Sequence, residues 1–160
     1  MRKVAVMLLV VMASVAPAVS AMAESATKEE CVAKCKEAVQ LINEKGLEAA
    51  LQEINKKDGK FVWKDSYVFV EDFKGTFLAQ PLRSELIGTN WLEHKGIDGK
   101  FTNKEFIEVV KTKGEGWVEY MHYKPAEFRK PAEERIRSKK MTYVLRVPGK
   151  DIFVGAGTFE

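Results

Sequence analysis

Residues 65–81 have the sequence Asp-Ser-Tyr-Val-Phe-Val-Glu-Asp-Phe-Lys-Gly-Thr-Phe-Leu-Ala-Gln-Pro, which is the pattern of a β-hairpin. Tyr67-Val-Phe-Val70 is aromatic and β-branched, as strands prefer, and Thr76-Phe-Leu-Ala79 mirrors it across the tight turn Asp72-Phe-Lys-Gly75. Pro81 ends the second strand because proline has no amide hydrogen to donate to a sheet. We therefore expect an antiparallel sheet in the part of the chain that follows residue 58.

Further strands are expected after this hairpin, at residues 117–123, 141–147 and 152–159. Before them, a helix packed on the sheet is indicated by Phe101, Phe106, Ile107, Val109 and Val110, and we expect Gly114 and Gly116 to end it. The segment 124–140 contains Pro125, Pro131 and a high density of charge, so we predict that it is the least structured part of the chain.

Two helices are predicted ahead of the sheet. Thr27-Lys-Glu-Glu30 forms a capping box, in which the Thr hydroxyl caps a backbone amide and Glu30 reaches back to the start. Apolar residues then recur at helical spacing from Cys31 to Ile42, Gly46 interrupts them, and Leu47 to Ile54 continue the pattern. The sequence therefore predicts an α+β domain with a helix pair before a five-stranded antiparallel sheet.

The first 23 residues have the pattern of a signal peptide. Arg2 and Lys3 precede an apolar run from Val4 to Val15, and Ala21-Met-Ala23 fits the cleavage pattern, with Val19-Ser-Ala21 as the alternative. The run is short for a membrane span, although an uncleaved anchor would tether the protein instead. We therefore predict a signal peptide at 1–23, a helical segment at 24–57, and a strand-rich domain at 58–160, exported to the periplasm or secreted.

The charge of the chain does not indicate a nucleic-acid function. Without Arg2 and Lys3, the 26 basic residues fall to 24 against 23 acidic ones, so that the net charge falls from +3 to +1. The basic residues between 129 and 140 are interleaved with Glu127, Glu133 and Glu134, which is typical of a solvated loop. Neither pattern indicates a nucleic-acid or membrane surface.

An enzyme is not indicated by the sequence. His94 and His122 are the only histidines, and no Ser or Cys nucleophile lies in a recognisable motif with either. The turns that follow Asp58, Asp72 and Asp98 lack the alternating oxygen ligands of a calcium loop. We expect no catalytic residue, metal site or cofactor.

Cys31 and Cys35 leave several roles open. Export favours a disulfide, but residues four apart on a helix hold their Cβ atoms about 5–6 Å apart, whereas a disulfide needs about 3.5–4.5 Å. The alternatives are a bridge between two chains through paired helices, or two reduced thiols that face the core or a partner. The C-x-x-C-H haem motif is absent.

The order of several short pieces resembles a single Cache domain of the second type, a PAS-like extracytoplasmic sensor module. The pieces are Tyr67-Val-Phe-Val70, Gly75-Thr-Phe-Leu-Ala-Gln-Pro81, Glu85-Leu-Ile-Gly88, Gly114-Glu-Gly-Trp-Val-Glu-Tyr120, Lys140-Met-Thr-Tyr143 and Gly155-Ala-Gly157. The resemblance covers residues 65–159, and the leading helix is also similar to the one that introduces such domains. It implies the binding of small ligands, often short carboxylates.

The resemblance also implies a set of ligand-binding residues. Carried over by position, the pocket is lined by Tyr67, Phe69, Gln80, Tyr120, His122, Lys140 and Tyr143. The alternation of side chains along a strand agrees for the pairs Tyr67–Phe69 and Tyr120–His122. The family usually has His in place of Gln80, an aromatic residue in place of His122, and Tyr in place of Phe159, so the resemblance does not name the ligand.

The function predicted from these observations is that of an exported, free-standing sensor module that binds a short carboxylate and passes the bound state to a membrane sensor kinase or chemoreceptor. The ligand would pin the segment 82–116 against the sheet, and the N-terminal helices would form a homodimer or docking face. The alternative is a structural or redox-linked interaction protein that dimerises through the N-terminal helix, Cys31 and Cys35.

Overall fold

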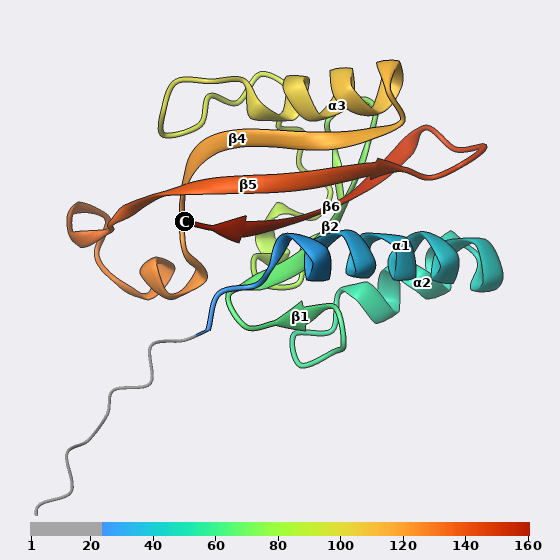
Figure 1. Cartoon of the computed structure of the whole chain (residues 1–160), viewed down its shortest axis with the longest axis horizontal. Coiled ribbons are helices and arrows are strands. Elements are labelled where there is room, and N and C mark those ends of the chain that lie inside the picture. Colours follow the sequence, from blue (N-terminus) through green and yellow to red (C-terminus); the bar gives the residue numbers. More distant parts are fainter. Residues whose placement is uncertain (1–23) are drawn as a thin grey trace, which may run out of the picture.

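A computed structural model describes residues 24–160 as helices packed on both faces of one antiparallel sheet (Figure 1). The predicted signal peptide, residues 1–23, lies outside the described residues. The helices are α1 (Lys28–Lys45), α2 (Leu47–Ile54) and α3 (Thr102–Thr112). The strands are β1 (Val62–Trp63), β2 (Ser66–Asp72), β3 (Phe77–Ala79), β4 (Glu115–Tyr123), β5 (Arg137–Arg146) and β6 (Ile152–Phe159).

The strand order is β1-β2-β6-β5-β4, and β3 pairs with the edge of β2 that β1 also uses. The α+β, PAS-like prediction is confirmed, although the sheet has six strands and not five. The additional strand is β1, whose two residues pair with Ser66 and Tyr67. A strand of two residues is too short to show a period in the sequence.

The capping box is formed as predicted: Glu30 N donates to Thr27 Oγ1 at 3.1 Å, and Thr27 N donates to the Glu30 carboxylate at 2.8 Å. Gly46 separates α1 from α2 at φ +80°, a conformation that favours glycine. The start of α1 is held to the sheet because Asp65 accepts hydrogen bonds from Ser25 Oγ and Ala26 N. These contacts fix the helix pair to one face of the sheet.

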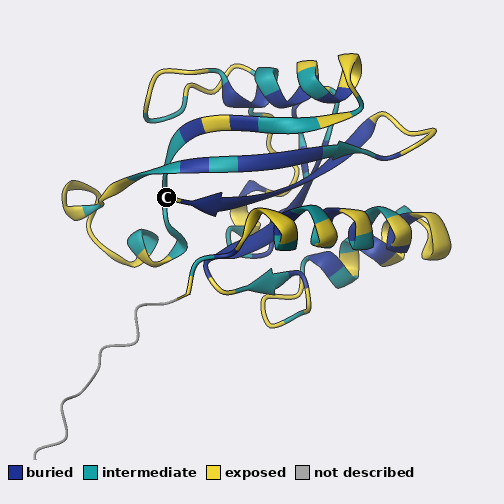
Figure 2. Cartoon of the chain, in the orientation of Figure 1, coloured by how far each residue is buried: buried dark blue, intermediate teal, exposed yellow. Residues whose placement is uncertain are grey.

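The sheet separates two hydrophobic clusters. Along β6, Val154 and Ala156 belong to the cluster that includes residues of α1 and α2, whereas Phe153 belongs to the cluster on the opposite side, which α3 and the loop 80–101 cover. All eight residues of β6 are buried, as the uniform dark blue of this strand shows (Figure 2). Since side chains alternate along a strand, each strand contributes to both clusters. We call the side under α1 and α2 the helix-pair face, and the side under α3 the cavity face.

Two boundaries differ from the sequence-based expectation. The segment 124–140 contains two short 3-10 helices, Pro125–Arg129 and Ala132–Glu134, and its last four residues already belong to β5. Gly114 alone ends α3, at φ +81°, while Gly116 lies within β4. A Cβ atom on Gly116 would lie 2.8 Å from Val109 Cγ1, so this glycine allows α3 to approach β4 closely.

Cys31 and Cys35 are both free thiols on the buried side of α1, with no exposed surface. Cys35 Sγ lies 3.9 Å from the carbonyl oxygen of Tyr143 on β5. Burial raises the pKa of Cys31 to about 11 and that of Cys35 well above its usual value. The possible disulfide is therefore absent, and a bridge between two chains is excluded in this conformation because neither sulfur reaches the surface.

Both thiols are expected to be unreactive in the folded protein, because burial excludes the reagent and disfavours the thiolate. With a chromogenic disulfide reagent at neutral pH, neither thiol should react in the native protein. Both should react after guanidinium is added. A Glu29→Cys variant supplies an exposed control on the same helix and should react at once. Rapid labelling of the unmodified native chain would contradict this burial.

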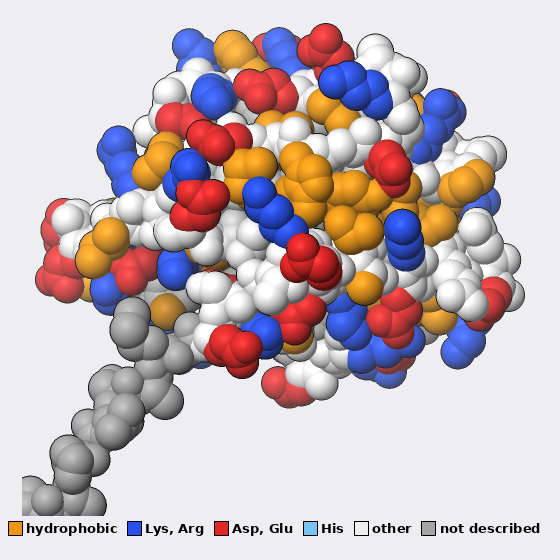
Figure 3. Space-filling view, in the orientation of Figure 1, with side chains coloured by type: hydrophobic (Ala, Val, Ile, Leu, Met, Phe, Trp, Pro, Cys, Tyr) orange, Lys and Arg blue, Asp and Glu red, His pale blue; other side chains and the backbone are white. Residues whose placement is uncertain are grey.

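Hydrophobic side chains also gather on the surface between α1 and the strands β4 and β5 (Figure 3). Val32, Val39, Trp117 and Leu145 are half-buried there and pack against the helix-pair cluster. The proposed homodimer or docking role of the N-terminal helices stays a prediction. Within residues 24–160, no helix has the length and apolarity that a membrane crossing requires.

Candidate ligand-binding site

A cavity of about 480 Å³ lies between the cavity face of the sheet and the cover formed by α3 and the loop 80–101. This volume is within the range of small-molecule sites. Six of the seven residues predicted from the sequence line it, namely Tyr67, Phe69, Gln80, Tyr120, His122 and Lys140. The alternation of strand residues brings them together: Tyr67 and Phe69 come from β2, Tyr120 and His122 from β4, and Lys140 from β5.

The expectation that Tyr143 lines the cavity is wrong. Lys140 and Tyr143 are three residues apart on β5, so their side chains point to opposite faces of the sheet. Tyr143 belongs to the helix-pair cluster, packs against Trp117, and donates a hydrogen bond to the carboxylate of Glu115. On the cavity face its place is taken by Thr142, whose hydroxyl lies 3.1 Å from the Tyr120 hydroxyl.

Lys140 is buried, with only 3% of its surface exposed. Its ammonium lies over the rings of Tyr67 and Phe159, at 4.9 and 5.0 Å from their centres. Burial opposes its charge, but Tyr120, Tyr67 and Cys31 act in the other direction, and the pKa of Lys140 lies above its usual value. The raised pKa favours the charged, ammonium form of Lys140.

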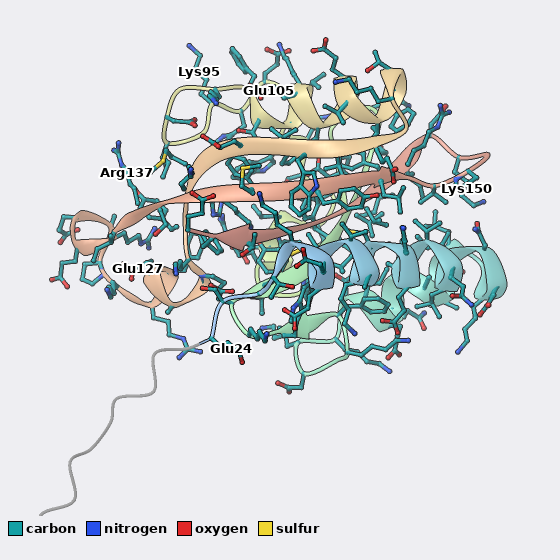
Figure 4. The ribbon with its side chains drawn as sticks, in the orientation of Figure 1. Glu24, Lys95, Glu105, Glu127, Arg137 and Lys150 are labelled. Carbon is teal, nitrogen blue, oxygen red and sulfur yellow. The ribbon has the colours of Figure 1, made fainter. Side chains whose placement is uncertain are left out.

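No carboxylate among residues 24–160 forms an ion pair with Lys140. The neighbouring Lys139 points outward and pairs with Glu119 and Glu160. Lys95, Arg137 and Lys150 likewise extend away from the fold at its periphery (Figure 4). A buried cation without a counter-ion is rare, because desolvation of a charge is costly unless a partner compensates it. An anion in the cavity would supply that partner.

Two glycines on β6 create the space for these side chains. A Cβ atom on Gly157 would lie 2.6 Å from Lys140 Cε and would also collide with Thr142 Oγ1. A Cβ atom on Gly155 would lie 2.6 Å from Cε1 of Phe69. The Gly-Ala-Gly sequence thus leaves a trough on the cavity face, while Ala156 between them packs on the helix-pair face.

Glu71 is the lining residue that sequence reasoning missed. It follows Tyr67 and Phe69 on the same face of β2 and has no exposed surface. Its Oε2 accepts a hydrogen bond from Asn103 Nδ2 on α3 at 2.8 Å, and its Oε1 has no partner. Burial raises the pKa of Glu71 to about 8, so it is mostly protonated at neutral pH.

Gln80 Oε1 and Thr102 Oγ1 are also buried without a hydrogen-bond partner, and both residues line the cavity. A buried polar group left unpaired costs roughly 1–3 kcal/mol. His122 adds a further acceptor: its Nδ1 lies 2.9 Å from the carbonyl oxygen of Tyr123 and donates to it, which leaves Nε2 free. Burial and the charge of Lys140 lower the pKa of His122 to about 3, so the ring is neutral.

The walls and the mouth of the cavity differ in character. Phe69, Phe77, Phe106 and Trp91 form an aromatic wall, with the rings of Phe69 and Phe106 5.8 Å apart. At the mouth, the guanidinium groups of Arg83 and Arg135 lie 5.0 and 5.5 Å from the centre of the Phe128 ring. Arg83 is paired with Glu85 at 2.9 Å, whereas Arg135 forms no ion pair among residues 24–160, so Arg135 contributes a positive charge that attracts anions.

The cover is tied to the sheet by backbone hydrogen bonds. Trp91 N donates to Gly75 O at 2.7 Å, and Phe77 N donates to Thr89 O at 3.1 Å. At the other end, Asp98 Oδ2 accepts from Met121 N at 3.0 Å.

Among residues 24–160, no group of three His, Cys, Asp or Glu side chains is placed to hold a metal ion.

Tyr143→Phe is expected to leave ligand affinity unchanged, since the lost hydroxyl is on the helix-pair face. It should lower the free energy of unfolding by roughly 0.5–1.5 kcal/mol through loss of the bond to Glu115. Tyr120→Phe is the matched comparison within the cavity and should change affinity. Calorimetric titration and urea unfolding of both variants provide the measurements, and an affinity loss confined to Tyr143→Phe would refute the placement.

Glu71→Gln is expected to change the pH dependence of stability. Between about pH 4.5 and 8 the folded state holds a proton on Glu71 that the unfolded state has released, so the wild type loses stability as pH rises. The variant lacks this loss, and its stability relative to the wild type should grow by about 1.4 kcal/mol per pH unit across that window. Urea unfolding at pH 5, 6.5 and 8 tests this, with the exposed Glu119→Gln as control. A difference that is constant with pH would show that Glu71 is ionised.

A family model described as a Cache domain matches residues 21–159 of the chain. A search of curated proteins found no match. The fold is similar to that of a methyl-accepting chemotaxis protein from Vibrio parahaemolyticus, with a TM-score of 0.66 and 20% identity, over 82% of this chain and 87% of the other.

Two further solved structures share the fold. One is the periplasmic sensor domain of a chemotaxis protein, with a TM-score of 0.61 and 19% identity, over 82% of this chain and 88% of the other. The second is a Cache chemosensory domain described for carboxylic acid recognition, with a TM-score of 0.60 and 22% identity, over 79% and 84%. At these identities the likeness concerns the fold.

Proposed function

The chain belongs to the Cache domain family, and from this premise we propose that it is an exported sensor module that binds a short carboxylate in the cavity under α3. The observation that carries the proposal is the buried ammonium of Lys140, which has no counter-ion among the described residues. A carboxylate fits this position in charge, and it can accept hydrogen bonds from the ammonium and from the hydroxyl of Tyr67 or Tyr120.

The size and lining of the cavity support a small organic acid. The aromatic wall suits a short carbon chain, and Arg135, which also lines the cavity, favours the entry of an anion. One structural relative is described for carboxylic acid recognition, which supports the same ligand class here. The chain binds the ligand reversibly and is not an enzyme, since the lining residues do not include a nucleophile beside a general base.

The bound state would be transmitted by a shift in population between two arrangements of the cover. The lining comes both from the sheet and from residues of the segment 82–116, such as Leu86, Trp91 and Phe106. A ligand that contacts both sides favours the arrangement in which this segment is closed on the sheet. A membrane receptor or sensor kinase outside the cytoplasm then reads the altered surface, which agrees with a signal peptide at residues 1–23.

Lys140→Met is expected to change binding and stability in opposite directions. Loss of the charged hydrogen bond should weaken the binding of a short carboxylate by about 10–150-fold, corresponding to roughly 1.5–3 kcal/mol. Without ligand, the variant should be at least as stable as the wild type, because methionine fills a similar volume and has no charge that folding must remove from water.

Calorimetric titration with acetate, propionate, pyruvate and their longer homologues measures the first effect, and thermal unfolding measures the second. Lys139→Met is the matched control, since that side chain lies next to Lys140 but points outward. Equal affinities of the wild type and Lys140→Met for the acid that binds best would refute the proposed function.

A further inference from the structure

The cavity lining contains a second group of polar side chains besides those around Lys140. Glu71, Thr102 and Gln80 contribute three oxygen atoms that have no hydrogen-bond partner in the protein. The three side chains are 0%, 6% and 4% exposed, so bulk water does not satisfy them. Native structures leave few buried polar groups unpaired, and three of them around one cavity indicate a place for a ligand group.

The chemistry of these three atoms selects what they can bind. Gln80 Oε1 accepts hydrogen bonds and the Thr102 hydroxyl can accept as well, while Glu71 Oε1 becomes an acceptor when the carboxyl group is ionised. Asn103 Nδ2 donates a hydrogen bond to Oε2 of Glu71. This bond fixes the orientation of the carboxyl group, whose Oε1 has no partner. The complement is a group rich in donors, and an ammonium offers three donors and a positive charge. With only one carboxylate, the set is too poor in ligands for a calcium ion.

Lys140 and Glu71 lie at different levels of the sheet, since Lys140 is opposite Phe159 on β6 and Glu71 is opposite Phe153. The ammonium of Lys140 lies over the ring of Tyr67, and Glu71 is four residues further along β2 than Tyr67. Four residues correspond to about 13 Å of strand. The distance between the two charged groups is shorter than this where their side chains reach toward each other. Phe69 lies between them on the same strand, with Phe106 beside it. An α-amino acid carries both charged groups on one carbon atom and cannot serve both ends, whereas the aromatic rings suit a chain of methylene groups.

We propose that Glu71, Thr102 and Gln80 form a subsite for an amino group, so that the ligand is a small amino acid whose amino group and carboxylate are at opposite ends of an unbranched chain. The inference rests on the proposed function, since Lys140 holds the carboxylate. When the ligand binds, Glu71 would release its proton to solvent, and the resulting carboxylate would face the ammonium.

The test compares three five-carbon acids by calorimetric titration: pentanoate, 5-aminopentanoate and 2-aminopentanoate. The wild type should bind 5-aminopentanoate at least about tenfold more tightly than pentanoate, as a charged hydrogen bond implies, and 2-aminopentanoate no more tightly than pentanoate. Glu71→Gln should abolish this preference and leave the affinity for pentanoate within about threefold. Glu108→Gln, on the exposed side of α3, should behave as the wild type.

Thr102→Val is a second variant that keeps the carboxyl group, and it should reduce the preference by a factor of about three or more, so the test does not depend on Glu71→Gln folding. The inference is overturned if the wild type shows no preference for 5-aminopentanoate, if the preference survives both variants, or if 2-aminopentanoate gains as much. If one of these outcomes is found while pentanoate binds the wild type and Lys140→Met weakens this binding, the inference fails and the proposed function stands. If no acid binds the wild type, the proposed function fails as well.

Discussion

The two central strands, β2 and β6, are buried on both faces, and this constraint determines where every side chain along them can go. On one side Val68, Val70, Val154 and Ala156 pack against the helix pair, as in an ordinary hydrophobic core. On the other side β2 contributes Tyr67, Phe69 and Glu71 to the lining of the cavity. The fold thus keeps one face for stability and uses the other as an enclosed site, without any residue having to serve both.

The cavity face contains groups that weaken a fold taken by itself. Lys140 is a buried charge without a partner, and the carboxyl of Glu71 has one unpaired oxygen. Gly155 and Gly157 have no side chains to pack, which leaves space for Phe69 and Lys140. Each of these features costs stability in the empty protein and is understandable if a ligand supplies the missing contacts. Concentration of such groups in one cavity is typical of functional sites.

Much of this arrangement could be predicted from the sequence, because it follows from local rules. The capping box at Thr27, the break at Gly46 and the strand from Ile152 to Phe159 lie where the sequence places them. The period of two also predicted that Tyr67 and Phe69, and Tyr120 and His122, share a face. The same rule, applied from Lys140, would have excluded Tyr143, whose place in the pocket came from the family resemblance alone.

Other features depend on contacts that no local pattern contains. Glu71 has the period of the cavity face, but a carboxylate in a strand is usually exposed, and only its contact with Asn103 on α3 explains its burial. Arg83, Phe128 and Arg135 come from two loops and meet only in the folded protein. The burial of Cys31 and Cys35 depends on which side of α1 faces the sheet, which the spacing of the cysteines does not reveal.

The most direct test of the account is a crystal structure of the protein with the carboxylate that stabilises it most in a thermal-shift screen. The account predicts density for the acid within the cavity under α3, with a carboxylate oxygen about 2.7–2.9 Å from Lys140 Nζ. An acid bound elsewhere on the molecule, or one inside the cavity whose carboxylate points away from Lys140, would contradict the central claim.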